Sequence, residues 1–302
     1  MNEKIPQFLY NKLINQYGNE ITEEIINGYS KKRFVTLRVN TIKSTVENVT
    51  NILKENNITY NEVKWSKEAL IIENANENDI RKLKIYENGE IYLQSLSSMI
   101  PPIILDAKAG ENVLDMTAAP GGKTTQIAAL SSNEALITAC EKNKIRLEKL
   151  KYNIEKQEAK RINVMNIDAR NLDEFFSFDK ILLDAPCSGS GTIYLNDEKM
   201  ENKFTEDLIK RSIKFQEELI NKALKVLKIG EEMVYSTCSI LQEENEQIIQ
   251  KILNKGNAQI ILIDKENLKG IPFLPTKIEG AICVKPTDLY EGFFVAKIKK
   301  VK

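Results

Sequence analysis

The sequence of 302 residues contains no histidine and only four cysteines. Without histidine, neither an imidazole general base nor a histidine-ligated metal site can form, so any nucleophile must be activated by other groups. The cysteines are spaced 47, 51 and 45 residues apart, at Cys140, Cys187, Cys238 and Cys283. This spacing fits neither a zinc ribbon nor a disulfide scaffold, so we predict no metal. On composition alone, each cysteine is interpreted as a small buried hydrophobic residue.

The chain also lacks an excess of charge, with 43 Lys and Arg residues against 43 Asp and Glu residues. A nucleic-acid partner would then be held by local basic patches, because there is no global positive field. No apolar run is long enough to cross a bilayer, and the first six residues do not form a basic and then apolar export signal. We expect a cytoplasmic monomer without a membrane partner.

Hydrophobic periodicity divides the chain near residue 88. Residues 1–88 predict a small α+β unit, with two short helices separated near Gly18, a strand at Phe34–Asn40, a helix at Ser44–Asn56 and a pair of strands within Asn61–Ile72. Residues 89–302 then alternate between strand and helix patterns, which predicts βαβ units and a mostly parallel sheet. The seven expected strands are Asn112–Met116, Ala135–Ala139, Ile162–Met165, Lys180–Leu183, Glu232–Tyr235, Gln259–Ile263 and Phe293–Ile298.

The stretch Asn112–Thr125 combines a strand, a tight turn and the start of a helix, and its turn reads Ala-Ala-Pro-Gly-Gly-Lys-Thr. Glycine allows a ligand to approach the main chain, and free amides at a helix N-terminus favour an anionic or carboxylate group. A nucleotide-like cofactor is therefore expected here. A phosphate-binding P-loop is the rival interpretation, but it requires glycine five residues before Gly122, where this chain has Thr117.

Two further motifs end predicted strands: Asp184–Cys187 reads Asp-Ala-Pro-Cys, and Tyr235–Cys238 reads Tyr-Ser-Thr-Cys. Together with the glycine turn, they resemble the motifs of the NOP/Sun (RsmB-like) family of S-adenosylmethionine-dependent RNA 5-methylcytosine methyltransferases. The resemblance runs from about Leu37 to the C-terminus. It implies an α/β fold in which a Rossmann-like, seven-stranded methyltransferase sheet at 89–302 follows an RNA-recognition-like unit at 1–88. It also implies S-adenosylmethionine as cofactor and rRNA or tRNA as partner.

Carboxylates at strand ends are the first candidates for cofactor binding, because ligands of parallel sheets sit outside the carboxyl ends of the strands. Glu141 follows the second strand, where a carboxylate accepts ribose hydroxyls, and Asp168 follows the third, where it can accept the adenine amino group. Either residue could instead be a helix N-cap. The resemblance supports the cofactor roles. The full set of expected cofactor-binding residues is Thr117, Ala118, Ala119, Pro120, Gly121, Gly122, Lys123, Glu141, Asp168 and Asp184.

By the resemblance, Cys238 is the nucleophile of the reaction. Carbon 5 of cytosine reacts poorly with an electrophile, and a thiolate that adds at carbon 6 raises the electron density at carbon 5 and can leave again. Ser239 and Gln242 have the spacing of a capping box. This box would place Cys238 just outside a helix N-terminus, where the helix dipole favours a thiolate.

Three more residues are expected to act on the base. Asp184 could protonate or hydrogen-bond the ring nitrogen, and Lys123 could bind the base oxygen or position the base. Cys187 is the family's candidate for helping product release, directly or through water. Cys140 and Cys283 lie in apolar strand contexts and are expected to be buried without a chemical role.

The RNA-binding surface is less well defined by the sequence. A basic cluster at Lys31, Lys32, Arg33 and Arg38, with Phe34 for stacking, could contact phosphates or could be a solvated turn. The charged residues of the helix expected at 142–160 are interpreted as a solvated outer face.

The chain departs from the family pattern at Ser95, Tyr194, Leu195, Cys283 and Glu291. Most of these departures fall on the RNA side, so RNA docking is the part of the resemblance that is least safe to transfer to this chain.

Two other functions remain open. A DNA cytosine-5 methyltransferase is disfavoured, because such enzymes use the Pro-Cys cysteine alone and this chain also has Cys238. No separate target-recognition region is present either. A non-catalytic ribosome-assembly factor that binds RNA is disfavoured, since it would need no reactive thiol.

Overall fold

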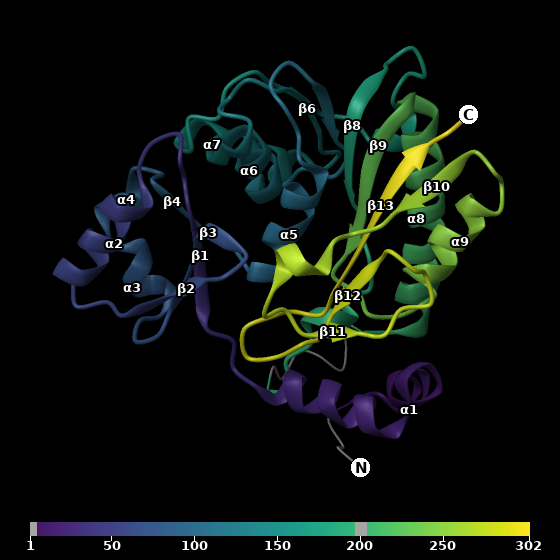
Figure 1. Cartoon of the computed structure of the whole chain (residues 1–302), viewed down its shortest axis with the longest axis horizontal. Helices are drawn as coiled ribbons and strands as arrows, with labels where there is room; N and C mark the ends of the chain where they lie inside the picture. The colour runs from purple at the N-terminus through teal and green to yellow at the C-terminus, as the bar shows by residue number, and fades with distance from the viewer. Residues whose placement is uncertain (1–4, 197–203) are drawn as a thin grey trace.

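This computed structural model describes residues 5–196 and 204–302. These residues form two β-sheets, each accompanied by helices (Figure 1). The smaller sheet is antiparallel and belongs mainly to the N-terminal third of the chain, whereas the larger is mostly parallel. Residues 1–4, part of the segment where no export signal was expected, lie outside the described residues. In the described ranges, no helix combines the length and apolarity that a membrane span requires.

The small sheet has the strand order β2-β3-β1-β4, with all neighbours antiparallel. Its strands are β1 (Val35–Val39), β2 (Tyr60–Val63), β3 (Ser66–Ile72) and β4 (Ile91–Leu93). Three helices accompany it: α2 (Val46–Glu55), α3 (Glu77–Arg81) and α4 (Lys84–Glu87). Their apolar side chains form one core with the sheet. The predicted strand, helix and strand pair are all present. A domain boundary at residue 88 stays a prediction, and β4, which completes this sheet, lies beyond that position.

Helix α1 (Gln7–Ser30) is bent at Gly18, whose φ of 77° interrupts the helix, so the expected break is present. Although it lies within residues 1–88, α1 packs against the large unit, beneath it in Figure 1. The hydroxyl of Tyr17 donates to the carbonyl of Ile240 at 2.6 Å, and that of Tyr29 donates to the carbonyl of Ser190 at 2.6 Å. The helix therefore supports loops at the carboxyl ends of the large sheet.

The large sheet has nine strands in the order β11-β12-β13-β9-β8-β5-β6-β7, with β10 also paired to β13. The five strands from β9 to β7 are parallel, and the others are antiparallel. The bounds are β5 (Asn112–Asp115), β6 (Leu136–Cys140), β7 (Ile162–Met165), β8 (Phe178–Asp184), β9 (Leu227–Thr237), β10 (Ala258–Ile261), β11 (Phe273–Leu274), β12 (Ile282–Val284) and β13 (Phe293–Lys300). All seven predicted strands are present, and the Rossmann-like architecture is confirmed. The two short strands β11 and β12 were not predicted.

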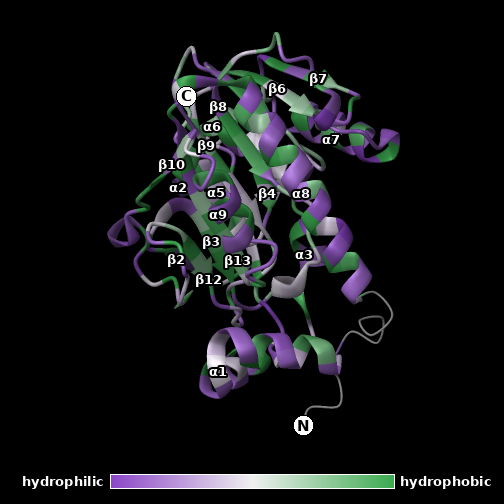
Figure 2. Ribbon diagram, turned by 90° about the vertical axis from the view of Figure 1, so that its right-hand side faces the viewer, coloured by the Kyte–Doolittle hydropathy of each residue, from purple (hydrophilic) through white to green (hydrophobic). Residues whose placement is uncertain are grey.

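Helices cover both faces of this sheet, and its strands are hydrophobic on both sides (Figure 2). Along β9, Met233 and Tyr235 join the core that contains α8 and α9, whereas Val234 joins the core that contains α5 and α6. This alternation is expected of strands buried on both faces. The helices are α5 (Leu96–Leu105), α6 (Gly122–Leu130), α7 (Lys144–Lys156), α8 (Glu206–Val226) and α9 (Glu246–Leu253), with single 3₁₀ turns at Ala169–Asn171, Ser190–Thr192 and Lys265–Leu268.

Buried polar side chains hold the small unit against α6 and α7. Arg38 donates from Nε to Gln94 Oε1 at 3.1 Å and from Nη2 to Thr125 Oγ1 at 3.2 Å. Asn40 donates to the carbonyl of Gln157 at 2.8 Å. Because Arg38 is only 3% exposed, it cannot contact phosphates as the basic-cluster hypothesis proposed. The family-like segment around Arg38 instead fixes the position of one unit against the other.

Candidate active site

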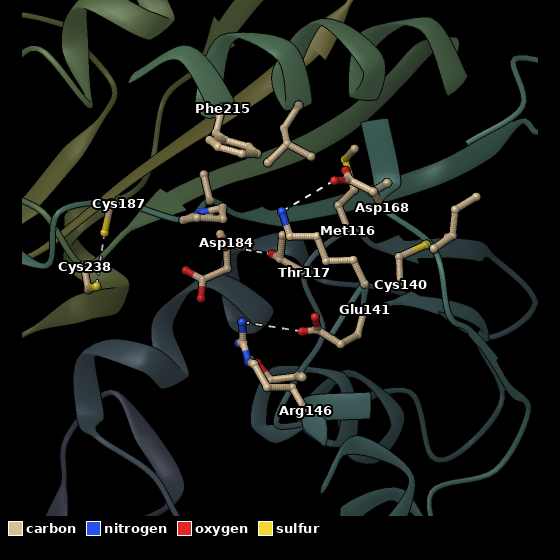
Figure 3. Close-up of a pocket in the computed structure, with 17 residues that line it drawn as sticks. Met116, Thr117, Cys140, Glu141, Arg146, Asp168, Asp184, Cys187, Phe215 and Cys238 are labelled. Carbon is tan, nitrogen blue, oxygen red and sulfur yellow. Dashed lines mark hydrogen bonds and ion pairs between the residues drawn. The ribbon is translucent and has the colours of Figure 1, made fainter. Parts of the chain in front are cut away.

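The carboxyl ends of the parallel strands open onto one cleft of about 230 Å³, shown in Figure 3. It brings together residues that lie far apart in the sequence, from the end of β5 to the end of β9. Those predicted from the sequence are Thr117, Ala119, Glu141, Asp168, Asp184, Cys187 and Cys238. A second cleft of about 260 Å³ is lined by Ala118, Pro120, Gly122 and Lys123. The two clefts share Thr117, Ala119 and Asp184, so they lie on either side of the glycine turn.

The glycine turn is braced by Asp115 at the end of β5. Its carboxylate accepts the N–H of Thr117 at 3.3 Å and the hydroxyl of Thr124 at 2.7 Å. Burial raises the pKa of Asp115 to about 6, although both hydrogen bonds favour the charged form. Gly121 has a φ of 110°, a conformation that side chains rarely adopt, and α6 begins at the next residue. The turn thus holds the backbone of Thr117–Gly122 at the start of a helix.

Glu141 and Asp168 lie at the far end of the larger cleft, where Figure 3 shows both carboxylates. Asp168 accepts two hydrogen bonds from the guanidinium of Arg170, at 2.9 and 2.7 Å, which lowers the pKa of Asp168 to about 2. It also accepts the N–H of Arg170, so it does cap the short 3₁₀ helix that follows. Glu141 accepts the N–H of Asn143 at 2.7 Å. It is not a helix N-cap, because Asn143 caps α7. Both carboxylates are therefore held in place at the cleft wall.

Asp184 ends β8 and is clamped from two sides. Its Oδ2 lies 2.8 Å from Lys123 Nζ, and its Oδ1 accepts the hydroxyl of Ser236 at 2.8 Å. Lys123 also donates to Ser98 Oγ at 2.8 Å. Burial by itself would lower the pKa of Lys123, but the Asp184 carboxylate outweighs this effect and the pKa is raised. The site therefore presents an ammonium group and a carboxylate side by side.

Cys187 and Cys238 meet where the two strand-end loops approach each other, and their Sγ atoms are 3.2 Å apart (Figure 3). The hydrogen bond between the thiols and burial together hold the pKa of Cys187 well above its usual value. Cys187 thus keeps its proton at neutral pH and can donate it toward Cys238. The pair faces the same cleft as Asp184.

The expected helix next to Cys238 is absent, and the capping-box prediction for Ser239 and Gln242 is wrong. Residues 242–245 form a turn, and α9 begins only at Glu246. The hydroxyl of Ser239 instead donates to Glu244 Oε2 at 2.6 Å and lies 2.8 Å from Ser190 Oγ. A helix dipole therefore does not explain the reactivity expected of Cys238.

Glu244 is the residue that ties the two cysteine loops together, and the sequence reasoning did not assign it a role. It is fully buried, and its carboxylate accepts from Ser188 N at 2.7 Å, Ser188 Oγ at 2.6 Å and Ser239 Oγ at 2.6 Å. Burial raises the pKa of Glu244 despite these bonds. Ser188 follows Cys187 and Ser239 follows Cys238, so one carboxylate fixes the spacing of the two thiols.

Other side chains of the site were also not predicted. Ser98 and Ser236 hold the Lys123–Asp184 pair, and Arg146 donates to the carbonyl of Ala119 at 2.6 Å while lying 3.6 Å from Glu141. A sequence signal existed for Ser98 and Glu244, which belong to segments that match the family. Ser236 belongs to the Tyr-Ser-Thr-Cys motif, so a signal existed for it as well. For Arg146 there was none, since nothing in a helix pattern shows which side chain faces a cleft.

Cys140 and Cys283 are buried, as expected. Burial raises the pKa of Cys140 to about 12, so it stays protonated although it borders the cleft. Cys283 lies in β12 with its Sγ 4.0 Å from the hydroxyl of Tyr17. Leu195 is buried as well, at 6% exposure. Two of the departures from the family pattern are thus in the core and cannot face RNA.

The basic cluster at 31–38 is largely dispersed. Arg38 is buried, and Arg33 donates to the carbonyls of Thr192 and Ile193 at 3.4 and 3.1 Å. Only Lys31, Lys32 and Phe34 remain exposed. Arg38 therefore drops out of the predicted cluster, and whether Lys31, Lys32 and Phe34 contact phosphates or form a solvated turn stays a prediction.

Strand order and site together place this protein in the class of Rossmann-like methyltransferases. Comparison with known proteins narrows the class: residues 102–299 match the model of the 16S rRNA methyltransferase RsmB/F family, and residues 5–79 match the ferredoxin-like domain of RsmF/B-like methyltransferases. The chain belongs to this RsmB/F family, as the motifs predicted.

Individual relatives agree with this assignment. Ribosomal RNA small subunit methyltransferase F of Shewanella piezotolerans is 34% identical over 287 residues, covering 92% of this chain and 60% of the relative. The tRNA (cytosine(72)-C(5))-methyltransferase of Pyrococcus horikoshii is 37% identical over 230 residues, covering 74% of this chain and 56% of the relative. The crystal structure of a methyltransferase homolog protein from Pyrococcus horikoshii superposes with a TM-score of 0.82 at 32% identity, covering 98% of this chain and 100% of that one. The chain spans about 60% of the length of curated relatives such as the Shewanella protein.

Proposed function

We propose that this protein is an S-adenosylmethionine-dependent RNA (cytosine-5) methyltransferase that acts on rRNA or tRNA as a cytoplasmic monomer. The observation that carries the proposal is the pair of thiols, 3.2 Å apart, that faces the same cleft as the Lys123–Asp184 ion pair. Relatives named as rRNA and tRNA methyltransferases support the substrate class. The proposed chemistry uses no metal.

The larger cleft has the donor set that S-adenosylmethionine would need. Glu141 would accept the ribose hydroxyls and Asp168 the adenine amino group, with Ile167 and Phe215 as apolar neighbours of the purine. The backbone from Thr117 to Lys123 would hold the carboxylate end, because free amides at a helix start favour an anion. When bound, the cofactor supplies an electrophilic methyl group.

The chain's own residues would then carry cytosine through addition and elimination. Cys238 Sγ forms a bond to carbon 6, and the electron density that reaches carbon 5 accepts the methyl group. Asp184 in its protonated form would donate a hydrogen bond to the ring nitrogen, which is an acceptor, and Lys123 would bind the base oxygen or position the base. Water then takes the proton of carbon 5, the electron pair of that C–H bond restores the ring double bond, and the bond between carbon 6 and Sγ breaks with its electrons remaining on sulfur as the thiolate of Cys238.

Asp168→Asn tests the cofactor site. The change removes the charge and exchanges one carboxylate oxygen for a donor, so the adenine amino group faces a weaker neutral acceptor or a competing N–H. We expect affinity for S-adenosylmethionine, measured by titration calorimetry, to fall by about 1 to 3 kcal/mol. Asp173→Asn is the matched control, since Asp173 also accepts a local backbone N–H but does not line the cleft.

Thermal unfolding of both variants without ligand separates a weaker hydrogen bond to the cofactor from a damaged fold. If Asp168→Asn bound the cofactor as tightly as the parent protein, Asp168 would have to be removed from the proposed site.

A further inference from the structure

A third cavity of about 440 Å³ lies where the small unit meets α7, and the proposed mechanism makes no use of it. One wall comes from α3, α4 and β4, and the other from α7, which lies beside α4 in Figure 1. Its chemically distinctive lining residues are Arg81, Lys149 and Lys156, together with Tyr86, Tyr92 and Tyr152. We call this cavity the junction groove.

The groove is basic in a chain with no net charge. Three of its lining residues are cations and none is a carboxylate. Burial lowers the pKa of Lys156, and the neighbouring Arg81 adds to this effect. Carboxylates outside the lining compensate part of this charge, since Glu77 lies 2.9 Å from Arg81 and Glu87 opposes the shift in the pKa of Lys156. Lys149 and Lys156 make no ion pair within the described residues, and phosphates are the anions that such lysines attract in nucleic-acid-binding proteins.

The cations alternate with aromatic rings. Lys156 Nζ lies 3.8 Å from the centre of the Tyr86 ring, and the guanidinium of Arg81 lies 5.2 Å from the same ring. Tyr152 is 60% exposed. Tyr86 and Tyr92 are half-buried, so Tyr152 is the ring of the groove that is open to stacking. Cations beside an exposed ring bind single strands, because phosphates pair with the cations while a base stacks on the ring.

The groove adjoins the active site, and hydrogen bonds tie its walls together. Asn153 of α7 donates to the carbonyl of Pro120 at 2.8 Å, and Gln157 donates to the carbonyl of Ile91 at 3.1 Å. The groove shares Tyr92, Leu93 and Pro120 with the cleft that contains Lys123. A strand lying in the groove could therefore pass the glycine turn and present a nucleotide to Asp184.

We propose that the junction groove binds the single-stranded RNA segment next to the target cytosine. The proposal rests on the proposed function. It specifies the substrate as RNA in which the target cytosine lies in an unpaired stretch. It also changes the interpretation of α7, whose charged residues were expected to be a solvated outer face: Lys149 and Lys156 line the groove, whereas Lys144 does not.

The test compares substitutions inside and outside the groove on the same helix. Binding of a fluorescent single-stranded RNA oligonucleotide to the full chain is measured between low and moderate salt. Lys149→Gln with Lys156→Gln should reduce the slope of log affinity against log salt by about 1.4, or about 0.7 for each phosphate that is no longer neutralised. Tyr152→Ala should weaken binding about tenfold. Lys144→Gln, an exposed position on α7 outside the groove, should leave the slope unchanged.

A methylation assay separates failure of this proposal from failure of the proposed function. With unmodified bulk RNA as substrate, the groove variants should raise KM several-fold with little change in kcat. If the parent protein methylates RNA but the Lys149/Lys156 variant keeps its slope and KM, the groove does not bind RNA. If the parent protein neither binds nor methylates RNA, the proposed function itself is wrong.

Discussion

Cys238→Ala should abolish both methyl transfer and covalent capture of RNA. The variant retains the cleft, the Lys123–Asp184 pair and Cys187, but it lacks the only sulfur expected to add to carbon 6. Loss of a covalent nucleophile lowers turnover by several orders of magnitude. The measurement uses RNA containing 5-fluorocytosine, because fluorine at carbon 5 cannot leave as a proton does. The parent protein should form a band of low mobility on a denaturing gel, and the variant should form none.

Two controls make this result specific. Cys238→Ser keeps a side chain of similar size, but its hydroxyl is far less acidic than a thiol. This variant should therefore be as inactive as Cys238→Ala. Cys283→Ala removes a thiol buried away from the cleft and should still trap the fluorinated RNA. Capture by Cys238→Ala would show that another residue adds to the base.

Cys187→Ala should have the opposite effect and accumulate a covalent protein–RNA adduct with ordinary RNA. The thiol of Cys187 lies 3.2 Å from Cys238 Sγ and keeps its proton, so it can stabilise the thiolate that departs when the product forms. Without it, addition still occurs but elimination slows. The adduct should be visible on a denaturing gel without fluorinated RNA, and it should carry the methyl group.

The double variant Cys187→Ala with Cys238→Ala should form no adduct, because the sulfur that bonds to RNA is gone. If Cys187→Ala gave no adduct while Cys238→Ala still trapped fluorinated RNA, the roles of the two thiols would be reversed. The protein would then use the Pro-Cys cysteine as nucleophile, as DNA cytosine-5 methyltransferases do.

Much of the fold followed from local patterns. The glycine turn, the strand-end carboxylates and the two cysteine motifs each follow a hydrophobic strand, and parallel strands bring their carboxyl ends to one edge. The cleft accordingly contains Glu141, Asp168, Asp184, Cys187 and Cys238 together. The short strands β11 and β12 were missed, because two or three residues carry too little periodicity to be recognised.

The errors arose where tertiary contacts decide a residue's role. Ser239 and Gln242 have capping-box spacing, yet Glu244 takes the Ser239 hydroxyl into a buried network and the chain turns before α9 starts. Arg38 looks like part of a basic patch, but burial against Gln94 and Thr125 makes it a structural residue. The junction groove was invisible to sequence reasoning, since its walls lie more than 50 residues apart along the chain.

The most direct test of the proposed function is the modification itself. Total RNA from a strain that lacks this gene would be incubated with the purified protein and S-adenosylmethionine and then mapped by bisulfite sequencing. We predict new 5-methylcytosine at one or a few unpaired positions of rRNA or tRNA, absent when Cys238→Ala replaces the parent protein. The account would be contradicted if the protein bound both RNA and cofactor but left every cytosine unmodified.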